Sequence, residues 1–415
     1  MWNQEKPLKI TIVWEQNEWG GVDSYLNYLL SDWPCGEDIF TVVYNSENKG
    51  AKRLQLSLKN KENINFLEIP SIFEYRPNSK TLSKIYKVLI YLITPLIFVV
   101  SSIKYRKIFL NLSPDVVLSQ NGGYPGGYGN ISAIFGAAWA GVYVRTLVIH
   151  HAATKPNYLH GWFRLIMERS LAKVLSSLLT VSEVTKNTIL MNTRISDDQV
   201  CRIMVIDNGV PISRSAPELN PKKNSDHIVI GILGRLESYK GHEDFLHALY
   251  LLSNECLEKI RVRFIGGYEP IDFKRITKLI ELLNLEAVVV IEGYIDANIS
   301  EIICQLDLVA MVTNTFEGFG LTIIEALHND VPVLTTKVGI APSLFSENSP
   351  LIVNIGDTEG MAAAIKCFIS ENDKTVFIPT SIKEGLWKYD SRVMSRRYRE
   401  HLSFEYIKHS VKNLN

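Results

Sequence analysis

The sequence predicts an α/β fold of two Rossmann-like domains, each built on a doubly wound parallel sheet. Short apolar runs typical of buried strands alternate with helical stretches along nearly the whole chain, which favours parallel strands joined by right-handed crossovers. The alternation stops once, in a polar stretch with two prolines over 212–226, and then starts again. At 415 residues the chain is long enough for two or three domains of roughly 100–200 residues each.

These observations divide the chain into four parts. We expect an N-terminal domain over 1–211, a linker over 212–226, a C-terminal domain over 227–385 and a charged helical tail over 386–415 that crosses back to the N-terminal domain. A ligand is expected in the cleft between the two sheets, beyond the carboxyl ends of their strands.

The elements follow in order along the chain. In the first domain the strand-like runs are KITIVW, IFTVVY, DVVLS, VRTLVIH and SLLTV, with helices expected over about Val22–Leu30, Ile131–Ala140 and Trp162–Leu175. In the second domain the strand-like runs are HIVIGIL, RVRFIGG, VVVIEG, DLVAMV and PVLTT, with a helix expected over Gly241–Leu252. The tail is expected to be helical from about Trp387 to Leu414.

One apolar segment, Val88–Ile103, carries no charge and is flanked by cations. These cations are Lys80, Lys84, Lys87, Lys104, Arg106 and Lys107. Three interpretations stay open: a buried helix of the first domain, a helix lying in a membrane interface with its cations on anionic head groups, or a spanning helix. The third is short of the roughly 20 apolar residues that a span needs, and Pro95 interrupts it.

Composition argues against several classes of protein. Lys+Arg and Asp+Glu each number 44, so no overall positive charge points to nucleic acid. The five cysteines are scattered without paired spacing, which argues against a disulfide framework or a structural zinc site. The first residues lack the basic and apolar regions of a signal peptide, so we expect a cytoplasmic protein.

The strongest chemical signal is the stretch TFEGFGLTIIEAL, which follows an apolar strand and opens a helix. Gly318 and Gly320 allow a tight turn and a close approach of the backbone to a ligand. The amides of Phe319, Gly320 and Leu321 would then form an anion site at the start of the helix.

Two carboxylates accompany this anion site. Glu317 lies on the loop, and Glu325 lies about a turn and a half into the helix. Carboxylates accept hydrogen bonds from hydroxyl groups, so the pair suits a sugar and a ribose better than a phosphate. The alternative is that Glu317 caps the helix and Glu325 makes a surface ion pair.

A second signal follows the strand HIVIGIL, which ends at Gly234. Arg235 and Lys240 lie on the next loop, and Gly241 opens a helix. Two cations at the carboxyl end of a parallel strand are placed to bind a diphosphate, Arg through forked hydrogen bonds and Lys as a point charge. The alternative is a pair of solvated loop cations.

Together the two motifs resemble those of the family 4 glycosyltransferases, which have the GT-B fold. The family pattern is G-R-L-x3-K-G followed by E-G-F-G-L and a second Glu eight positions after the first; this chain carries both, over 234–241 and 317–325. The resemblance extends over 8–370 and is sharpest in the C-terminal half. It implies transfer of a sugar with retention of anomeric configuration by front-face attack. No Asp-x-Asp triplet occurs in the sequence, so no metal is indicated.

The resemblance implies a role for each matching residue. Arg235 and Lys240 would neutralise the donor diphosphate, Glu317 would contact the transferred sugar, and Glu325 would bind the ribose. Backbone positions implied to line the donor site are Gly20, Gly21, Gly234, Gly266, Gly267, Gly318, Phe319, Gly320 and Leu321.

The family's strand-end histidine, which reaches the donor sugar, corresponds to His150 of the VIHH run, with His151 as second choice. The alternative is a neutral histidine held by backbone groups. A glycine-rich loop over 121–130 also follows a strand. We expect Asn121, Tyr124 and Tyr128 to face an acceptor sugar, unless the loop only turns the chain.

The sequence departs from the family pattern at three places. Asp330 replaces the usual Gly before the Val-Pro-Val strand, and Asp tolerates left-handed backbone, so we expect the turn to survive. Thr313-Asn314 replaces Pro-Ser, and Ser343 replaces a Glu. These changes bear on the identity of the donor more than on activity.

We therefore expect a retaining glycosyltransferase that acts in assembly of bacterial surface polysaccharide, such as O-antigen, capsule or exopolysaccharide. Its expected partners are a nucleoside-diphosphate sugar, a saccharide or lipid-linked saccharide acceptor, and the inner face of the plasma membrane, contacted peripherally through 88–103. No cofactor, metal or nucleic acid is expected. Two alternatives stay open: a GT-B-type nucleotide-sugar epimerase and a non-enzymatic nucleotide-sugar-binding subunit.

Overall fold

The computed structural model describes residues 6–17, 20–70, 80–156, 161–195, 202–212, 227–295 and 297–412. The chain divides into two compact units, a first unit of Met1–Gly209 with Ser391–Asn415 and a second unit of Val210–Asp390. The expected boundaries at 211 and 386 lie close to these limits. Apart from Ile212, the expected linker over 212–226 falls outside the described residues.

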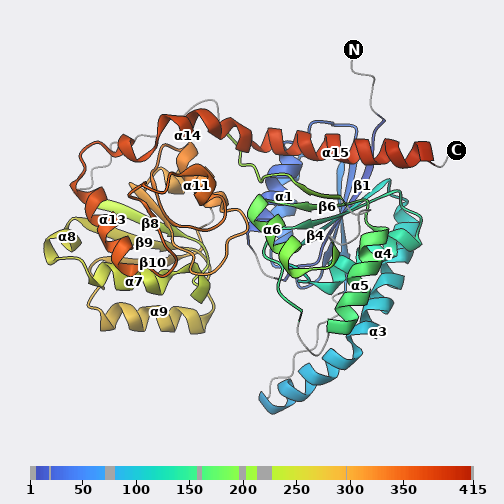
Figure 1. Ribbon diagram of the computed structural model, residues 1–415, viewed down its shortest axis with the longest axis horizontal. Helices are drawn as coiled ribbons and strands as arrows, with labels where there is room; N and C mark the ends of the chain where they lie inside the picture. Colours follow the sequence, from blue (N-terminus) through green and yellow to red (C-terminus); the bar gives the residue numbers. More distant parts are fainter. Residues whose placement is uncertain are drawn as a thin grey trace. The chain divides into compact units, whose positions relative to one another are not determined.

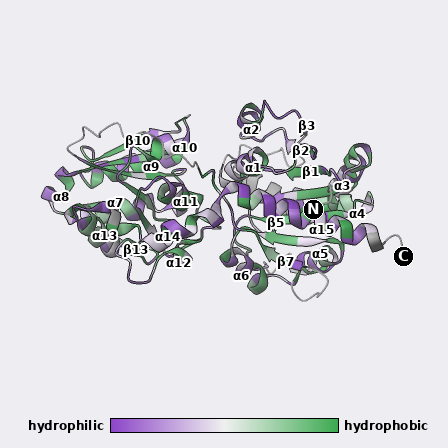
Figure 2. Cartoon of the chain, turned by 90° about the horizontal axis from the view of Figure 1, so that it is seen from above, coloured by the Kyte–Doolittle hydropathy of each residue, from purple (hydrophilic) through white to green (hydrophobic). Residues whose placement is uncertain are grey.

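The first unit is built on a seven-stranded parallel sheet with strand order β3-β2-β1-β4-β5-β6-β7. Its strands are β1 (Lys9–Trp14), β2 (Ile39–Asn45), β3 (Ile64–Ile69), β4 (Val116–Asn121), β5 (Val144–Ile149), β6 (Ser177–Thr180) and β7 (Arg202–Val205). The central strands are almost wholly buried, which is why they read as continuous apolar runs; Figure 2 shows hydrophobic residues along β5. The order reverses between β1 and β4, as in a doubly wound sheet.

Seven helices of the described chain surround this sheet. They are α1 (Gly21–Ser31), α2 (Ala51–Ser57), α3 (Lys80–Leu112), α4 (Tyr128–Trp139), α5 (Gly161–Val174), α6 (Glu183–Asn192) and α15 (Ser391–Lys412). The small-residue helix α4 is buried on most of its surface between the sheet and α3. The three helices expected in this half are present, each within three residues of the expected ends.

The C-terminal helix α15 packs on the first unit, running beside α1 (Figure 1). Arg399 of α15 forms a buried ion pair with Asp38, with Nε lying 2.5 Å from Oδ2. Asp38 also accepts hydrogen bonds from the Leu8 amide and the Trp33 indole, each at 2.8 Å. The Asp38 carboxylate therefore links the residue before β1 to helix α15.

Helix α3 is longer than the apolar segment 88–103, and Pro95 lies inside it rather than interrupting it. A proline removes one backbone hydrogen bond, but packing of the helix face on α4 supplies most of its stability. From Ile93 onward, one face is buried and carries Phe98, Tyr105 and Phe109. The opposite face exposes apolar side chains, so the segment is neither fully buried nor fully exposed.

The second unit is built on a six-stranded parallel sheet with order β10-β9-β8-β11-β12-β13. Its strands are β8 (Ile228–Leu233), β9 (Ile260–Ile265), β10 (Val289–Gly293), β11 (Leu308–Met311), β12 (Val333–Thr336) and β13 (Ile352–Val353). The order reverses between β8 and β11. The chain therefore has two doubly wound sheets, which confirms the predicted fold class.

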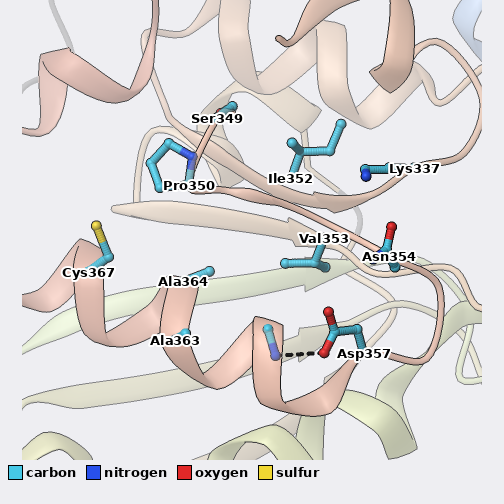
Figure 3. A pocket seen from close by; sticks show the side chains of 11 residues that line it. Lys337, Ser349, Pro350, Ile352, Val353, Asn354, Asp357, Ala363, Ala364 and Cys367 are labelled. Carbon is cyan, nitrogen blue, oxygen red and sulfur yellow. Dashed lines mark hydrogen bonds between the residues drawn. The ribbon is translucent and has the colours of Figure 1, made fainter. Parts of the chain in front are cut away.

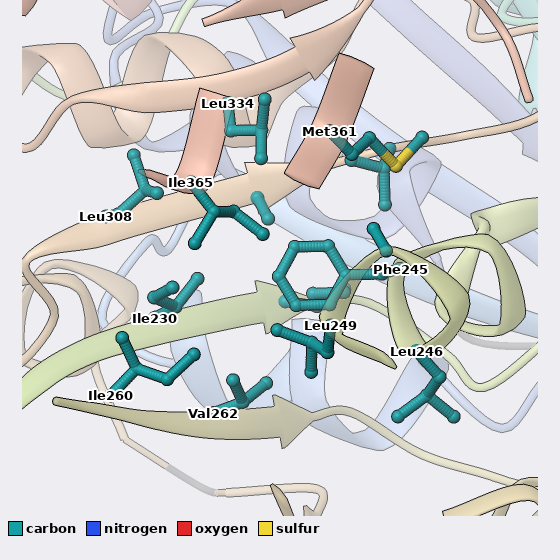
Figure 4. Packing of buried hydrophobic residues seen from close by; sticks show 14 of the residues in the cluster. Ile230, Phe245, Leu246, Leu249, Ile260, Val262, Leu308, Leu334, Met361 and Ile365 are labelled. Carbon is teal, nitrogen blue, oxygen red and sulfur yellow. The ribbon is translucent and has the colours of Figure 1, made fainter. Parts of the chain in front are cut away.

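The α-helices of the second unit are α7 (His242–Tyr250), α8 (Asn254–Glu258), α9 (Pro270–Leu282), α10 (Ile299–Ile303), α11 (Leu321–His328), α12 (Ala341–Leu344), α13 (Thr358–Ser370) and α14 (Thr380–Gly385). Short 3-10 helices lie at η2 (Ser238–Lys240), η3 (Lys374–Phe377) and η4 (Leu386–Tyr389). Figure 4 shows Phe245 and Leu249 of α7 packing with Ile365 of α13 over Ile230 and Val262 of the sheet. This core fixes the strand ends from which the candidate site projects.

Candidate functional site

The candidate site lies where the second sheet reverses its strand order. Strands β8 and β11 pair directly, so the loops that leave their carboxyl ends are neighbours. The Asn314 amide after β11 donates to the Tyr239 carbonyl after β8 at 2.8 Å, which ties the two loops together. In doubly wound sheets this reversal opens the crevice that binds ligands.

The loop after β8 holds its shape through a required glycine. Gly241 has φ of +79°, and a side chain there would collide with the Val312 carbonyl. Only glycine adopts that backbone without strain and leaves room for the β11 loop. Gly241 thereby fixes Lys240, the last residue of η2, against the neighbouring loop.

Lys240 and Glu317 form an ion pair across the two loops. Nζ of Lys240 lies 2.9 Å from Oε2 of Glu317, and both side chains are partly exposed. From the sequence, Lys240 is expected to bind a diphosphate and Glu317 to contact a sugar. The structure brings these two residues into direct contact.

Arg235 follows Gly234 at the end of β8 and lies beside Glu237. Its Nη1 is 3.0 Å from Oε1 of Glu237, and about a third of each side chain is exposed. The guanidinium is therefore held on the loop while part of it stays accessible. Glu237 and Tyr239 were not singled out from the sequence, although they lie inside the motif that was.

The loop after β11 leads into helix α11. Phe319 is buried and its ring meets that of Tyr389 edge-on, with centroids 5.9 Å apart. Gly318 and Gly320 are also buried, and Gly320 is the N-cap residue that precedes Leu321. The Phe319 carbonyl accepts from the Ile340 amide at 2.8 Å, so the loop after β12 supports the start of the helix.

Glu325 and the glycines after β9 complete the expected donor residues of this unit. Glu325 lies on α11 and is buried, with 7% of its surface exposed. The Gly267 carbonyl accepts from the Leu236 amide at 3.1 Å, and the Gly266 amide donates to the Gly293 carbonyl at 2.7 Å. The loops after β8, β9 and β10 are thus joined at one edge of the sheet.

Two of the three departures from the family pattern, Asp330 and Asn314, have structural explanations. Asp330 has φ of +56°, so the left-handed turn is kept, as expected. The Asn314 side chain donates to Asp244 Oδ2 at 3.1 Å, which ties the β11 loop to α7 in addition to the loop after β8. Ser343 lies in the short helix α12, and its hydroxyl donates to the Ile340 carbonyl at 2.8 Å.

In the first unit, Gly20 and Gly21 begin helix α1. The Gly20 amide donates to Asp23 Oδ2 at 2.5 Å. A side chain added at Gly21 would meet no atom within 4 Å, so space is open in front of it. Their approach to a donor phosphate stays a prediction, as do the donor contacts of the second unit.

His150 lies at the carboxyl end of β5 and is neutral. Nε2 lies 2.8 Å from Oε1 of Gln120, and the Tyr25 ring packs on the imidazole with centroids 4.6 Å apart. Burial lowers the pKa of His150 to about 3. The partner is a side-chain amide, which differs from the backbone partner that the alternative interpretation expected. His151 lies next to it and is half-buried.

The loop over 121–130 does not present all three of its candidate acceptor residues. Asn121 is fully buried, and its side chain spans the loop, accepting from the Gly127 amide at 3.0 Å and donating to the Pro125 carbonyl at 2.8 Å. Tyr124 is buried beneath the Arg164 guanidinium, 5.2 Å from its ring centre. Only Tyr128 is partly exposed. We expected all three to face a sugar; Asn121 and Tyr124 instead shape the loop.

Helix α3 presents an apolar surface on the first unit. We call the set Ile93, Leu96, Val99, Val100 and Ile103 the α3 apolar surface; each is at least 36% exposed. Lys104, Arg106 and Lys107 follow it on the next turn. Across the described residues, no helix combines the length and hydropathy needed to cross a membrane.

A shallow pocket of about 390 Å³ opens elsewhere on the second unit, beside β13 and α13 (Figure 3). Its lining includes Lys337, Asn354, Asp357 and Cys367 and none of the expected site residues. Within the part of the chain that the structure describes, no group of three or more His, Cys, Asp or Glu side chains is placed to hold a metal ion.

Comparison with known proteins relates this geometry to a family. Residues 217–378 match the family described as glycosyl transferases group 1. The chain is 27% identical over 209 residues to the phosphatidylinositol N-acetylglucosaminyltransferase GPI3 subunit of Saccharomyces cerevisiae, covering 48% of this chain and 44% of that protein. It is 24% identical over 208 residues to the MMP alpha-(1->4)-mannosyltransferase of Mycolicibacterium hassiacum, covering 49% and 48%. The chain thus spans about half the length of these curated relatives.

Among solved structures, the fold resembles that of Anabaena Alr3699/HepE, crystallised in complex with UDP and glucose. The TM-score is 0.69 with 19% sequence identity, over 95% of this chain and 99% of that one. At this sequence identity, the similarity shows the fold alone. With its two doubly wound parallel sheets the chain has the GT-B fold, and its second unit matches the glycosyl transferases group 1 over residues 217–378.

Proposed function

We propose that this chain transfers a sugar from a nucleoside-diphosphate sugar to an acceptor hydroxyl with retention of configuration. The observation that carries the proposal is that Arg235 and the Lys240–Glu317 ion pair lie on two adjacent loops at the reversal of the second sheet. Cations there compensate the charge that develops on a leaving diphosphate, and the start of α11 adds backbone amides. Glu317 binds hydroxyls of the transferred sugar, and Glu325 binds the ribose.

Retention follows from the face on which the acceptor attacks. In the proposed front-face reaction the acceptor attacks from the side of the leaving group, and the leaving phosphate takes the acceptor proton. No side chain then has to act as the base. His150, neutral because burial lowers its pKa to about 3, acts as a hydrogen-bonding contact to the donor sugar. The mannosyltransferase relative is named for an alpha-(1->4) linkage, which retention from an α-linked donor would give.

We further propose that the acceptor is a lipid-linked saccharide, in assembly of bacterial surface polysaccharide, and that the α3 apolar surface rests on the membrane. Exposed apolar side chains followed by three cations suit the boundary between acyl chains and anionic head groups. The yeast relative is named for a lipid acceptor, phosphatidylinositol, which agrees with a reaction at a membrane surface.

The test combines UDP-, GDP- and ADP-sugars with octyl glycosides as soluble acceptors. We expect one nucleotide class to give a disaccharide glycoside whose new anomeric centre, determined by NMR, has the configuration of the donor. An inverted product would overturn retention while keeping transfer. An epimerised donor without transfer would support the epimerase instead, and no change of any donor would favour a non-enzymatic binding subunit.

A further inference from the structure

Glu15 is an unassigned carboxylate at the sheet reversal of the first unit. It directly follows β1, which pairs with β4 at the point where the strand order turns round. In the second unit the corresponding loop, which begins after β8, carries Arg235. The crevice beyond such a reversal is where doubly wound sheets bind ligands.

The main chain of Glu15 is fixed by one buried side chain. The Glu15 amide donates to Asn130 Oδ1, and Asn130 Nδ2 donates back to the Glu15 carbonyl, both at 3.0 Å. Asn130 is 2% exposed, and its own carbonyl accepts from the Ser119 hydroxyl at 2.7 Å. The residue after β1 is therefore held against the start of α4.

The carboxylate is fixed as firmly as the backbone. The hydroxyl of the buried Tyr105 on α3 donates to Oε1 of Glu15. A side chain at Gly129 of α4 would collide with the carboxylate, so glycine leaves the notch in which Glu15 lies. Two helices and a strand end thus converge on a single carboxyl group.

The second oxygen of the Glu15 carboxylate is not bound by Tyr105. Among the residues that the structure describes, Oε2 of Glu15 has no hydrogen-bond partner; it lies against Gly129, and the residue is partly exposed. Burial raises the pKa of Glu15, and the Tyr105 hydroxyl and Lys104 oppose that effect by favouring the ionised form. A fixed, partly buried carboxylate oxygen is a strong acceptor for a hydroxyl donor.

We propose that Glu15 binds a hydroxyl group of the saccharide acceptor, with Oε2 accepting the hydrogen bond. The assignment rests on the proposed function, because it supplies that reaction with an acceptor contact in the first unit. Tyr105 and Gly129 act as positioning residues. Glu15 also takes the place of the buried Asn121 and Tyr124 as the residue through which this unit orients the sugar.

Steady-state transfer to octyl glucoside, galactoside, mannoside and N-acetylglucosaminide tests the assignment in Glu15→Gln. Glutamine keeps the size and the Tyr105 bond but replaces the free oxygen with a donor. We expect kcat/KM for every glycoside that the unmodified protein uses to fall about tenfold to a hundredfold, the factor for a lost hydrogen bond to a charged group. Donor hydrolysis, nucleotide affinity and the melting temperature stay unchanged.

Glu68→Gln is the matched control, because Glu68 accepts from Tyr44 at 3.2 Å on the edge strand β3 and lies away from the reversal. It leaves transfer unchanged, whereas Gly129→Ala, which displaces the carboxylate, lowers it in the same direction as Glu15→Gln. Transfer by Glu15→Gln at the unmodified rate overturns the assignment. So does donor hydrolysis without transfer to any of the four glycosides. Absence of nucleotide binding in the unmodified protein counts against the proposed function instead.

Discussion

Nζ of Lys240 lies 2.9 Å from Oε2 of Glu317, although 77 residues separate them. The pair places a cation and a carboxylate of the proposed donor site in contact with each other. A diphosphate that binds Lys240 must therefore compete with Glu317 for the ammonium group. Since both side chains are partly exposed, the pair itself is worth only about 0.2–1 kcal/mol and breaks readily.

Removing either cation should lower turnover. We expect Arg235→Ala and Lys240→Ala each to reduce kcat by roughly a hundredfold or more, the scale for loss of a group that stabilises developing charge. Sugar transfer at saturating donor measures the effect. Lys259→Ala is the control, because it breaks an exposed pair with Glu255 in the same unit and should leave kcat unchanged. If Arg235→Ala and Lys240→Ala both kept the kcat of the unmodified protein, the assignment of these residues to the diphosphate would be contradicted.

Glu317→Gln should separate nucleotide binding from sugar transfer. Without its carboxylate partner, Lys240 is free for phosphate, so affinity for the nucleoside diphosphate should rise by about two- to fivefold. Turnover should fall, because the variant loses a hydrogen bond to the transferred sugar. Calorimetric titration with the diphosphate, beside a transfer assay, measures both. Weaker diphosphate binding would show that Glu317 supports the site rather than competing within it.

The α3 apolar surface should control membrane binding. Leu96→Glu and Val100→Glu each put a charge on a side chain that is more than half exposed, so flotation with phosphatidylglycerol vesicles should fall at least about tenfold. Ile271→Glu, on the second unit, changes a side chain of 77% exposure and should float like the unmodified protein. Equal flotation of all three variants would contradict a membrane role for α3.

Acid should destabilise the fold through its buried histidines. Burial lowers the pKa of both His150 and His242 to about 3, and Lys240 and Arg275 add to the effect at His242. The unfolded chain takes up these protons near its ordinary histidine pKa of about 6.5, so stability falls as pH drops from there towards 3. The free energy of unfolding is measured by urea titration at several pH values between about 4.5 and 7.5. Its slope against pH should be smaller in His150→Asn or His242→Asn, by up to the contribution of about one proton. Unchanged slopes would mean that these rings are protonated in the fold.

Loss of the Arg399–Asp38 pair should unfold the first unit more easily. Asp38→Ala removes the carboxylate that compensates the charge of a buried guanidinium, which should cost about 3–5 kcal/mol. The free energy of unfolding in urea measures it. Lys383→Ala breaks an exposed pair with Asp330 and should cost less than about 1 kcal/mol. Similar small costs for both variants would show that the Arg399–Asp38 pair contributes little to the stability of the first unit.

The central strands and the motif residues could be predicted from the sequence, whereas three edge strands were missed. β3 and β7 lie at the two edges of the first sheet, and β13 at one edge of the second. An edge strand is half covered, so β3 and β7 alternate or stay partly exposed and lack a continuous apolar run. β13 has two residues, too few for any pattern.

The contacts of the site could not be predicted, because they depend on strand order. Nothing local indicates that Lys240 meets Glu317; that follows from β8 pairing with β11. Glu15 carries no motif, and its environment comes from Tyr105 and Asn130, which lie 90 and 115 residues away. The prediction that Asn121 and Tyr124 face a sugar was wrong for the same reason, because the sequence of a loop does not indicate which of its side chains are buried.

The most direct test of the donor site is calorimetric titration of the whole chain with UDP, GDP and ADP and their glucose, N-acetylglucosamine and mannose conjugates. We expect saturable binding of one nucleotide class, weakened at least about tenfold in Arg235→Ala, as for a lost charge-assisted hydrogen bond. Absence of binding for all three nucleotides, or equal affinity in Arg235→Ala, would contradict a donor site at the ends of β8 and β11.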